Sequence, residues 1–460
     1  MTDSWKTWLW RTVITAAIVI VIAACFYAEE NSRGVSAWQK CARDITARGE
    51  SLDWNDYIPA PVPDEKNFYK APMMAEWFIK STNSIASHPL YSLPASNPET
   101  TAEAITEITA SNYIAWSMTF EPGFDLMRAA VKRPLARLDG DYSRPFKQPI
   151  PNFVSHRLVA QTLARRAKCY LLLGEPEKAL ADLTLLHSLD LTLVKDGKPN
   201  TLVTAMIHTA IAGLFADAIA CGLESRFWRE PELAALQKQL AEINLLHDVA
   251  YSFQAGRAST CFMLDSMPPE ELMRVINSST RQVSDLGWWL MPSGWIQQNK
   301  TVIATLEGKI IEAMDFTNTT VSPDKAVVAS HATETALSHV TPWNFLAAMC
   351  VPNFTKATET MARNQTWVDQ AEIACALERF RLTNGKYPDK LAALVPQFIA
   401  KIPHDLIGGK DMNYSCKDGD NFKLYSIGWN EIDDGGITAH TTDGKEDRDF
   451  GDWVWHYPQK

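Results

Sequence analysis

The stretch LARRAKCYLLLGEPEKALADL, at residues 163–183, decides the fold of this chain. Apolar and small residues recur in it every three to four positions, which is the period of an α-helix, and Gly174 interrupts them. Glycine permits a tight turn, and the proline that follows suits the first turn of a new helix. The pattern predicts an antiparallel helical hairpin, with one helix at residues 154–173 and the other at 176–193.

The spacing of small and apolar residues in this hairpin resembles that of a tetratricopeptide repeat. Six positions carry the resemblance: Ala167, Tyr170, Leu171, Gly174, Ala179 and Leu183. A repeat array needs at least three copies, and the sequence shows one convincing copy. We therefore expect a helical bundle at residues 151–363 rather than a solenoid. The almost uncharged segment 201–224 should be its most buried helix.

The composition of the 460 residues is that of a globular protein, with 46% hydrophobic and 21% charged residues. This length suggests more than one domain. A net charge of -10 argues against a nucleic-acid partner, which needs a basic surface. Eight scattered cysteines are too few for a disulfide scaffold. The expected fold class is mainly α, with a small C-terminal α+β module.

Residues 1–30 predict a membrane anchor. Lys6 and Arg11 precede the uncharged run TVITAAIVIVIAACFYA at residues 12–28, and two glutamates close it. Seventeen residues lie at the short end for a spanning helix, and a snorkelling Arg11 would lengthen it. Positive flanks stay in the cytoplasm. We expect a single-pass protein of the bacterial inner membrane, with the bulk of the chain periplasmic.

Two other interpretations of this segment stay open. Ile22-Ala23-Ala24-Cys25 fits the cleavage box of a bacterial lipoprotein, in which Cys25 would carry the lipid. A cleaved signal peptide is less favoured, because no A-x-A site is well placed. An uncut anchor is the preferred interpretation. All three place the remainder of the chain outside the cytoplasmic membrane.

Residues 31–150 are predicted to connect the anchor to the bundle. Residues 31–50 continue as a polar helix, which we interpret as a stalk. Alternating prolines at residues 58–63 exclude a helix and predict an extended strap. A mixed region follows, up to residue 150.

The last predicted domain is an α+β module at residues 364–460. Residues 364–383 read as an amphipathic helix, followed by a shorter helix that ends near residue 394. Residues 412–416 and 422–426 alternate in polarity on either side of a turn. This alternation predicts a β-hairpin.

Short motifs in this module resemble the C-terminal region of the major pseudopilins of type II secretion, over residues 364–455. The specific pieces are NGKYP at 384–388 and LYSIG at 424–428. The resemblance implies a helix packed on a small sheet, with an acidic loop that binds calcium. Residues 1–30 lack the pseudopilin leader, so we do not expect a pilin subunit. The whole arrangement also resembles a group of uncharacterised membrane-anchored bacterial envelope proteins, which implies an architecture and no activity.

The acidic end of this module is a candidate calcium site. Eight acids fall within residues 431–452, and calcium takes six to eight oxygen ligands in flexible geometry. A pair of glycines follows Asp433 and Asp434, and Asn430 adds an amide oxygen where a pseudopilin has an aspartate. We predict Asn430, Asp433, Asp434 and Asp449 as ligands. The alternative is a solvated acidic loop.

The sequence predicts no catalytic and no cofactor-binding residue. It contains no G-x-S-x-G, H-E-x-x-H, C-x-x-C, G-x-G-x-x-G or Walker signature. His208, in the most apolar helix, is expected to be a hydrogen-bonded core residue. Three cysteines are expected as buried thiols, namely Cys169, Cys221 and Cys375. Four others could pair after export, namely Cys41, Cys261, Cys350 and Cys416.

Three functions are compatible with these observations. The favoured one is a non-enzymatic, membrane-anchored extracytoplasmic protein that binds other envelope proteins. The second is an exported hydrolase with its active site between the bundle and the C-terminal module. The third is an accessory component of a secretion or pilus-like machine. A pocket with converging histidines and carboxylates would favour the hydrolase.

Overall fold

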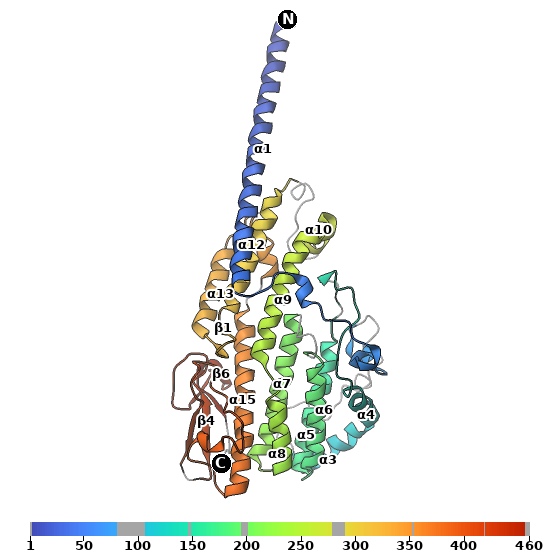
Figure 1. Ribbon diagram of the computed structural model, residues 1–460, viewed down its shortest axis with the longest axis vertical. Helices are drawn as coiled ribbons and strands as arrows, with labels where there is room; N and C mark the ends of the chain where they lie inside the picture. Colours follow the sequence, from blue (N-terminus) through green and yellow to red (C-terminus); the bar gives the residue numbers. More distant parts are fainter. Residues whose placement is uncertain are drawn as a thin grey trace. The chain divides into compact units, whose positions relative to one another are not determined.

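A computed structural model describes residues 2–80, 106–145, 148, 150–194, 201–277, 290–351, 354–417 and 419–455. The fold is mainly α with a small C-terminal region of short antiparallel strands, which confirms the predicted class (Figure 1). The chain forms two compact units. The first comprises Met1–Asp56, Arg257–Ile310 and Val328–Asn353, and the second comprises Tyr57–Gly256, Ile311–Val327 and Phe354–Lys460.

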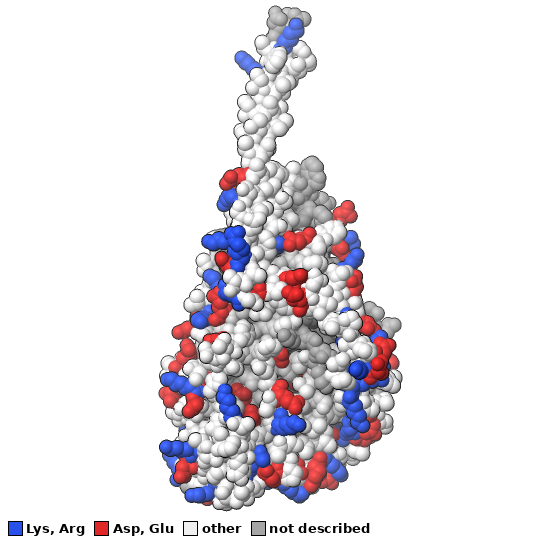
Figure 2. Space-filling view, viewed as in Figure 1, with Lys and Arg blue, Asp and Glu red and all other residues white. Residues whose placement is uncertain are grey.

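The first unit begins with α1 (Thr2–Ala47), one uninterrupted helix. Residues 5–26 are exposed all along it, and they include all but the last two residues of the predicted span. Figure 2 shows this part of α1 as a white stem with blue groups near its N-terminal end. The helix is long and apolar enough to cross a membrane, which makes it a candidate anchor.

The predicted stalk is the second half of α1, and it packs within the first unit against α12 (Ser293–Ile311). Trp295 Nε1 donates to Glu30 Oε2 over 2.8 Å. A Cβ added to Gly34 would lie 2.1 Å from the carbonyl oxygen of Gly294, so the two backbones touch. The shorter helices α10 (Pro269–Asn277) and α14 (Ala347–Cys350) also belong to this unit.

The bundle of the second unit is built on the predicted hairpin. It consists of α5 (Phe153–Leu172) and α6 (Pro176–Leu191), joined through Gly174 at φ +74°. The apolar α7 (Leu202–Glu224) packs on both and on α15 (Thr355–Asn384), which also contacts α8 (Glu230–Leu240). Leu171, Leu183 and Ile211 are buried, whereas Leu214 is half-buried.

Two helix boundaries differ from the prediction. The apolar periodicity of residues 230–261 predicts one helix, but these residues form two, α8 and α9 (Leu245–Ser266). Asn244 separates them, because its side chain accepts the backbone N–H of His247 at 3.1 Å and caps α9. The stretch that follows Met314 up to Pro342 is rich in Ser and Thr and predicts a loop, but it contains α13 (Pro323–Leu337). Its start, a serine followed by proline, is a capping signal that the sequence prediction missed.

Short elements cover the start of the second unit. They are η1 (Trp54–Tyr57), η2 (Asp64–Lys66), η3 (Phe68–Lys70), α2 (Met74–Phe78), α3 (Glu107–Ser117), η5 (Met118–Phe120) and α4 (Glu121–Ala130). The proline-rich residues between η1 and η2 form neither helix nor strand, as predicted. Arg137 Nε donates to the carbonyl of Pro59 at 3.1 Å, which ties this strap to the segment after α4.

The C-terminal region has two small sheets in addition to a short hairpin, β1 (Met314–Asp315) with β2 (Thr320–Val321). The predicted hairpin is confirmed as β3 (Asn413–Cys416) with β4 (Phe422–Ser426), and β7 (Trp453–Trp455) joins β4. The second sheet pairs β5 (Thr438–His440) with β6 (Glu446–Gly451). The short helix expected before it is only the turn η7 (Leu391–Leu394).

The predicted division into segments 1–30, 31–150, 151–363 and 364–460 differs from the observed units. The boundary at 363/364 falls inside α15, which begins at Thr355. This helix packs on α7 and α8 and also on β4 and β7. Because one helix serves both cores, the bundle and the C-terminal sheet belong to one unit.

Candidate functional site

The candidate site lies in the second unit, between α7, α15 and the last two strands. Helix α7 contributes positions i, i+3, i+4 and i+7, which share one helical face: Ala210, Gly213, Leu214 and Asp217. Helix α15 contributes the face made by Thr360, Arg363, Asn364, Thr366, Trp367 and Gln370. Strands β6 and β7 close it with Glu446, Arg448, Trp453 and Val454. We call this cavity of about 400 Å³ the α7–α15 pocket.

The walls of the pocket are fixed by contacts between its elements. A Cβ on Gly213 would lie 2.1 Å from Asn364 Oδ1, so the glycine leaves room for the Asn364 side chain between the two helices. Gln370 Nε2 donates to the carbonyl of Trp453 at 2.8 Å and joins α15 to β7. The rings of Trp367 and Trp455 lie 4.5 Å apart. These contacts give the pocket a preformed shape.

The charged groups of the pocket are only partly neutralised. Arg363 Nη2 donates to Glu446 Oε2, which links α15 to β6. Asp217 forms an ion pair with Lys168 at 2.6 Å. The exposed guanidinium of Arg448 has no partner among the described residues. The lining therefore carries one positive charge that no described side chain balances.

Three further polar atoms at the pocket lack a hydrogen-bond partner among the described residues: Arg363 Nη1, Thr366 Oγ1 and Gln370 Oε1. Thr366 and Gln370 are at most 1% exposed. Native proteins satisfy most buried polar groups, and each unsatisfied one costs about 1–3 kcal/mol. A bound molecule that supplied the missing partners would recover that free energy.

The lining favours binding over general acid–base or nucleophilic chemistry. No histidine, cysteine or serine belongs to it in the described part of the chain. Its two carboxylates, Asp217 and Glu446, are each held by a cation. Indole surfaces, amides and arginines are the groups that binding sites use to orient a ligand.

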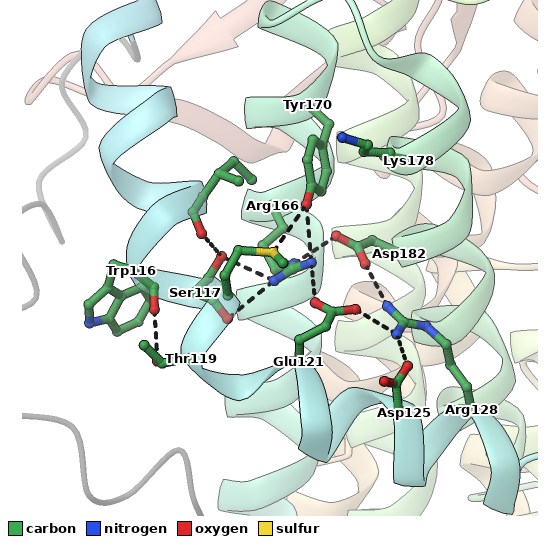
Figure 3. Close-up of polar contacts among 12 residues, drawn as sticks. Trp116, Ser117, Thr119, Glu121, Asp125, Arg128, Arg166, Tyr170, Lys178 and Asp182 are labelled. Carbon is green, nitrogen blue, oxygen red and sulfur yellow. Dashed lines mark hydrogen bonds and ion pairs between the residues drawn. The ribbon is translucent and has the colours of Figure 1, made fainter.

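A second polar cluster, the Arg166 network, lies at the helical hairpin (Figure 3). Arg166 Nε donates to Asp182 Oδ2 and its Nη2 to Glu121 Oε2, both at 2.8 Å. Its Nη1 donates to the hydroxyl and carbonyl oxygens of Ser117. Arg128 binds the same two acids from the other side. Every nitrogen of the Arg166 guanidinium donates a hydrogen bond within the protein, so we interpret this cluster as structural.

His208 occupies a third buried cluster, as expected of a core histidine. Its Nδ1 lies 2.9 Å from Asp190 Oδ1, and its Nε2 lies 3.4 Å from Asp248 Oδ2. Burial lowers the pKa of His208, but the two carboxylates outweigh it and raise the pKa to about 10. His208 is 1% exposed and does not line the α7–α15 pocket, so it is not placed to act on a ligand there.

The predicted calcium ligands have protein partners of their own. Asn430 Nδ2 lies 3.4 Å from Asp434 Oδ2, in one turn. Asp433 Oδ1 accepts the hydroxyl of Tyr425 at 3.2 Å. Asp449 is bound to Lys356 of α15 at 2.9 Å, and this bond lowers the pKa of its carboxyl. Asp449 thus links β6 to α15, whereas the other three predicted ligands lie in the turn after β4.

Sequence reasoning missed the acid that orders this turn. Asp452 is buried, and its two oxygens accept the backbone N–H groups of Asp434, Gly436 and Ile437 at 2.6–3.3 Å. Across the described residues, no three His, Cys, Asp or Glu side chains are grouped so that they could hold a metal ion. Calcium binding at Asn430, Asp433, Asp434 and Asp449 stays a prediction.

Two further features of the sequence are its cysteines and an apolar stretch at residues 265–300 that holds Trp288, Trp289 and Trp295. All eight cysteines are free thiols, and Cys169, Cys261 and Cys375 are buried. Burial raises the pKa of Cys261 to about 12, which makes it a poor nucleophile. Of the apolar excursion at 265–300, residues 278–289 lie outside the described part.

Comparisons with protein-family models, with curated proteins and with solved structures gave no match to this chain.

Proposed function

We propose that this chain is a membrane-anchored extracytoplasmic protein of the bacterial envelope that binds a ligand in the α7–α15 pocket. The observation that carries the proposal is the preformed cavity of about 400 Å³ whose lining holds unsatisfied polar atoms. Cavities of this size, with indole surfaces and a few placed polar groups, are typical of binding sites.

The cellular location rests on α1. Its exposed apolar half has Lys6 and Arg11 on the N-terminal side and Glu29 and Glu30 on the other. By the positive-inside rule, the N-terminus would then lie in the cytoplasm and the chain that follows the apolar half of α1 would lie outside it. Helix α7 is also long and apolar enough to span a membrane, but 56% of its apolar window is buried, which favours a core helix.

The exported hydrolase is the second candidate, because the pocket lies where that hypothesis placed an active site. It is formed by bundle helices on one side and C-terminal strands on the other. A reaction there would depend on Asp217 or Glu446, the carboxylates of the lining. Both acids form ion pairs, with Lys168 and Arg363, and this favours binding over catalysis. The secretion-machine hypothesis has no support beyond the pseudopilin resemblance.

The test of binding is a thermal-unfolding screen of the full chain in detergent against peptides, saccharides and nucleotides. A ligand of the folded state raises the melting temperature. Leu214→Trp fills the pocket, and Leu126→Trp on α4 is the control at an exposed site. We expect compounds that stabilise the wild type and Leu126→Trp but not Leu214→Trp. Equal stabilisation of all three, or of none, would contradict binding in this pocket.

Location has a separate test. A reporter fused after Lys460 should be active only when exported, because the positive residues precede the apolar part of α1. Activity of a cytoplasmic reporter at the same position would contradict the topology. Cys25→Ser separates the anchors, since loss of attachment or processing indicates a lipoprotein, and an unchanged protein indicates an uncut helix.

A further inference from the structure

The α7–α15 pocket carries a more specific inference, which rests on the proposed function. We propose that its ligand is the C-terminal end of a peptide, bound through the free carboxylate by Arg448 and Arg363 and through a backbone N–H by Gln370. Three features of the pocket point to such a ligand: its cations, its buried acceptor and its apolar surface.

The first feature is the pair of arginines, Arg363 and Arg448. Arg448 and Glu446 are two positions apart on β6 and therefore share one face of the strand. Glu446 on that face already engages Arg363, which leaves Nη1 of Arg363 without a partner among the described residues. The guanidinium of Arg448 is likewise unpartnered there. Two guanidinium groups with spare donors suit a carboxylate, whose two oxygens accept in a fork.

The second feature is a buried hydrogen-bond acceptor, Gln370 Oε1. Gln370 is 0% exposed, and its Nε2 is committed to the carbonyl of Trp453. That bond fixes the amide so that Oε1 is left as an acceptor with no described partner. An N–H donor is needed to satisfy it. A peptide supplies an N–H close to its terminal carboxylate, whereas a simple organic acid does not.

The third feature is the apolar surface of the pocket. Leu214 on α7, Trp367 on α15 and Val454 on β7 line the same cavity. They offer contact for an apolar terminal side chain. Thr366 adds a hydroxyl that can donate or accept. A cavity of about 400 Å³ holds a few residues of a peptide, not a folded partner.

The experiment measures binding of acetyl-alanyl-alanyl-leucine to the full chain in detergent by isothermal titration calorimetry. The same peptide with a C-terminal amide is the matched ligand. A hydrogen bond to a charged group contributes about 1.5–3 kcal/mol, so the amide should bind about ten- to hundred-fold more weakly. Arg448→Gln should weaken the free acid by a similar factor. Lys445→Gln, an exposed cation three positions before Arg448 and outside the pocket, should leave the affinity unchanged.

Equal affinities of acid and amide, or an unchanged affinity of Arg448→Gln, would overturn the peptide-terminus proposal. So would an absence of binding by the free acid. The binding function itself is judged separately, by whether any compound stabilises the wild type but not Leu214→Trp. A saccharide that did so would uphold the binding protein and replace its ligand class. Arg448 is exposed, so its substitution is not expected to affect folding.

Discussion

The Arg166 network and the α7–α15 pocket contain similar side chains but differ in how fully these side chains are hydrogen-bonded. Both place an arginine and acids between facing segments of the second unit. Around Arg166 the acids, a serine and a tyrosine hydroxyl use all of its donors, and its side chain is 2% exposed (Figure 3). At the pocket, Arg363 has one ion pair and one unpartnered nitrogen among the described residues.

The difference separates a structural cluster from a binding surface. A buried charge is tolerated when every donor and acceptor is used, and its loss then strands the partners. A cavity with spare donors and acceptors loses some stability to keep them available. We therefore expect the network to respond to mutation in the free energy of unfolding and the pocket to respond in affinity.

The largest predicted effect is on stability at Arg166. Arg166→Ala leaves Asp182, which is 1% exposed, without its closest cation. Breaking such a buried pair should cost about 3–5 kcal/mol of unfolding free energy, measured by urea denaturation. The matched change Arg363→Ala, at a 23% exposed side chain, should cost much less. Equal losses at the two sites would remove the distinction between network and pocket.

The next effect concerns pH and His208. Its pKa is about 10 in the folded chain, above the ordinary 6.5, so the folded state binds the proton more tightly. The stabilisation is fully present below pH 6.5 and is lost as the pH rises towards 10, at up to about 1.4 kcal/mol per pH unit. His208→Gln should flatten the stability profile between pH 7 and 9. A profile as steep as that of the wild type would show that His208 is not the titrating group.

A smaller effect is expected where the pocket helices touch. Gly213→Ala places a Cβ against Asn364 Oδ1 and should cost about 1–3 kcal/mol, as overpacking does. Asn364→Ala removes the obstacle. The double variant should therefore be more stable than the sum of the two single changes predicts, in a double-mutant cycle by urea denaturation. Strict additivity would mean that the helices do not meet at this glycine.

The smallest effect is that of calcium. Asp433 and Asp434 lie in one turn with Asn430, while Asp449 is held by Lys356. A site with so few available carboxylates would be weak, with a dissociation constant of about 10⁻⁴–10⁻³ M. We expect a small rise in melting temperature with millimolar calcium, absent in Asp433→Asn/Asp434→Asn. Identical melting of the wild type with calcium and with chelator would leave a solvated acidic loop.

Local patterns predicted much of this fold. The hairpin around Gly174, the apolar helix α7 and the β3–β4 hairpin follow from periodicity and turn residues close in sequence. The same logic missed α13, because its capping serine lies inside a stretch rich in threonine and serine. Whether a segment forms a helix or a strand depends mainly on nearby residues, so it could be predicted from the sequence. Which helices pack against each other depends on distant residues, so it could not.

The pocket was not predictable for that reason. Its two main faces, around Gly213 and Arg363, are 150 positions apart in sequence, and only packing of α7 against α15 brings them together. The acidic loop shows the converse error. Asp449 is close in sequence to the other acids, but Lys356 on a distant segment holds it, and Asp452 does the ordering work that the sequence assigned to no residue.

The central claim is that ligand binds at the pocket and not at the Arg166 network. Hydrogen–deuterium exchange of the full chain, with and without acetyl-alanyl-alanyl-leucine, tests it most directly, because both regions are read in one measurement. We expect the peptide to slow exchange in residues 360–370 and 446–454 and to leave residues 117–128 and 166–182 unchanged. Slowed exchange at the network alone, or no change anywhere at saturating peptide, would contradict it.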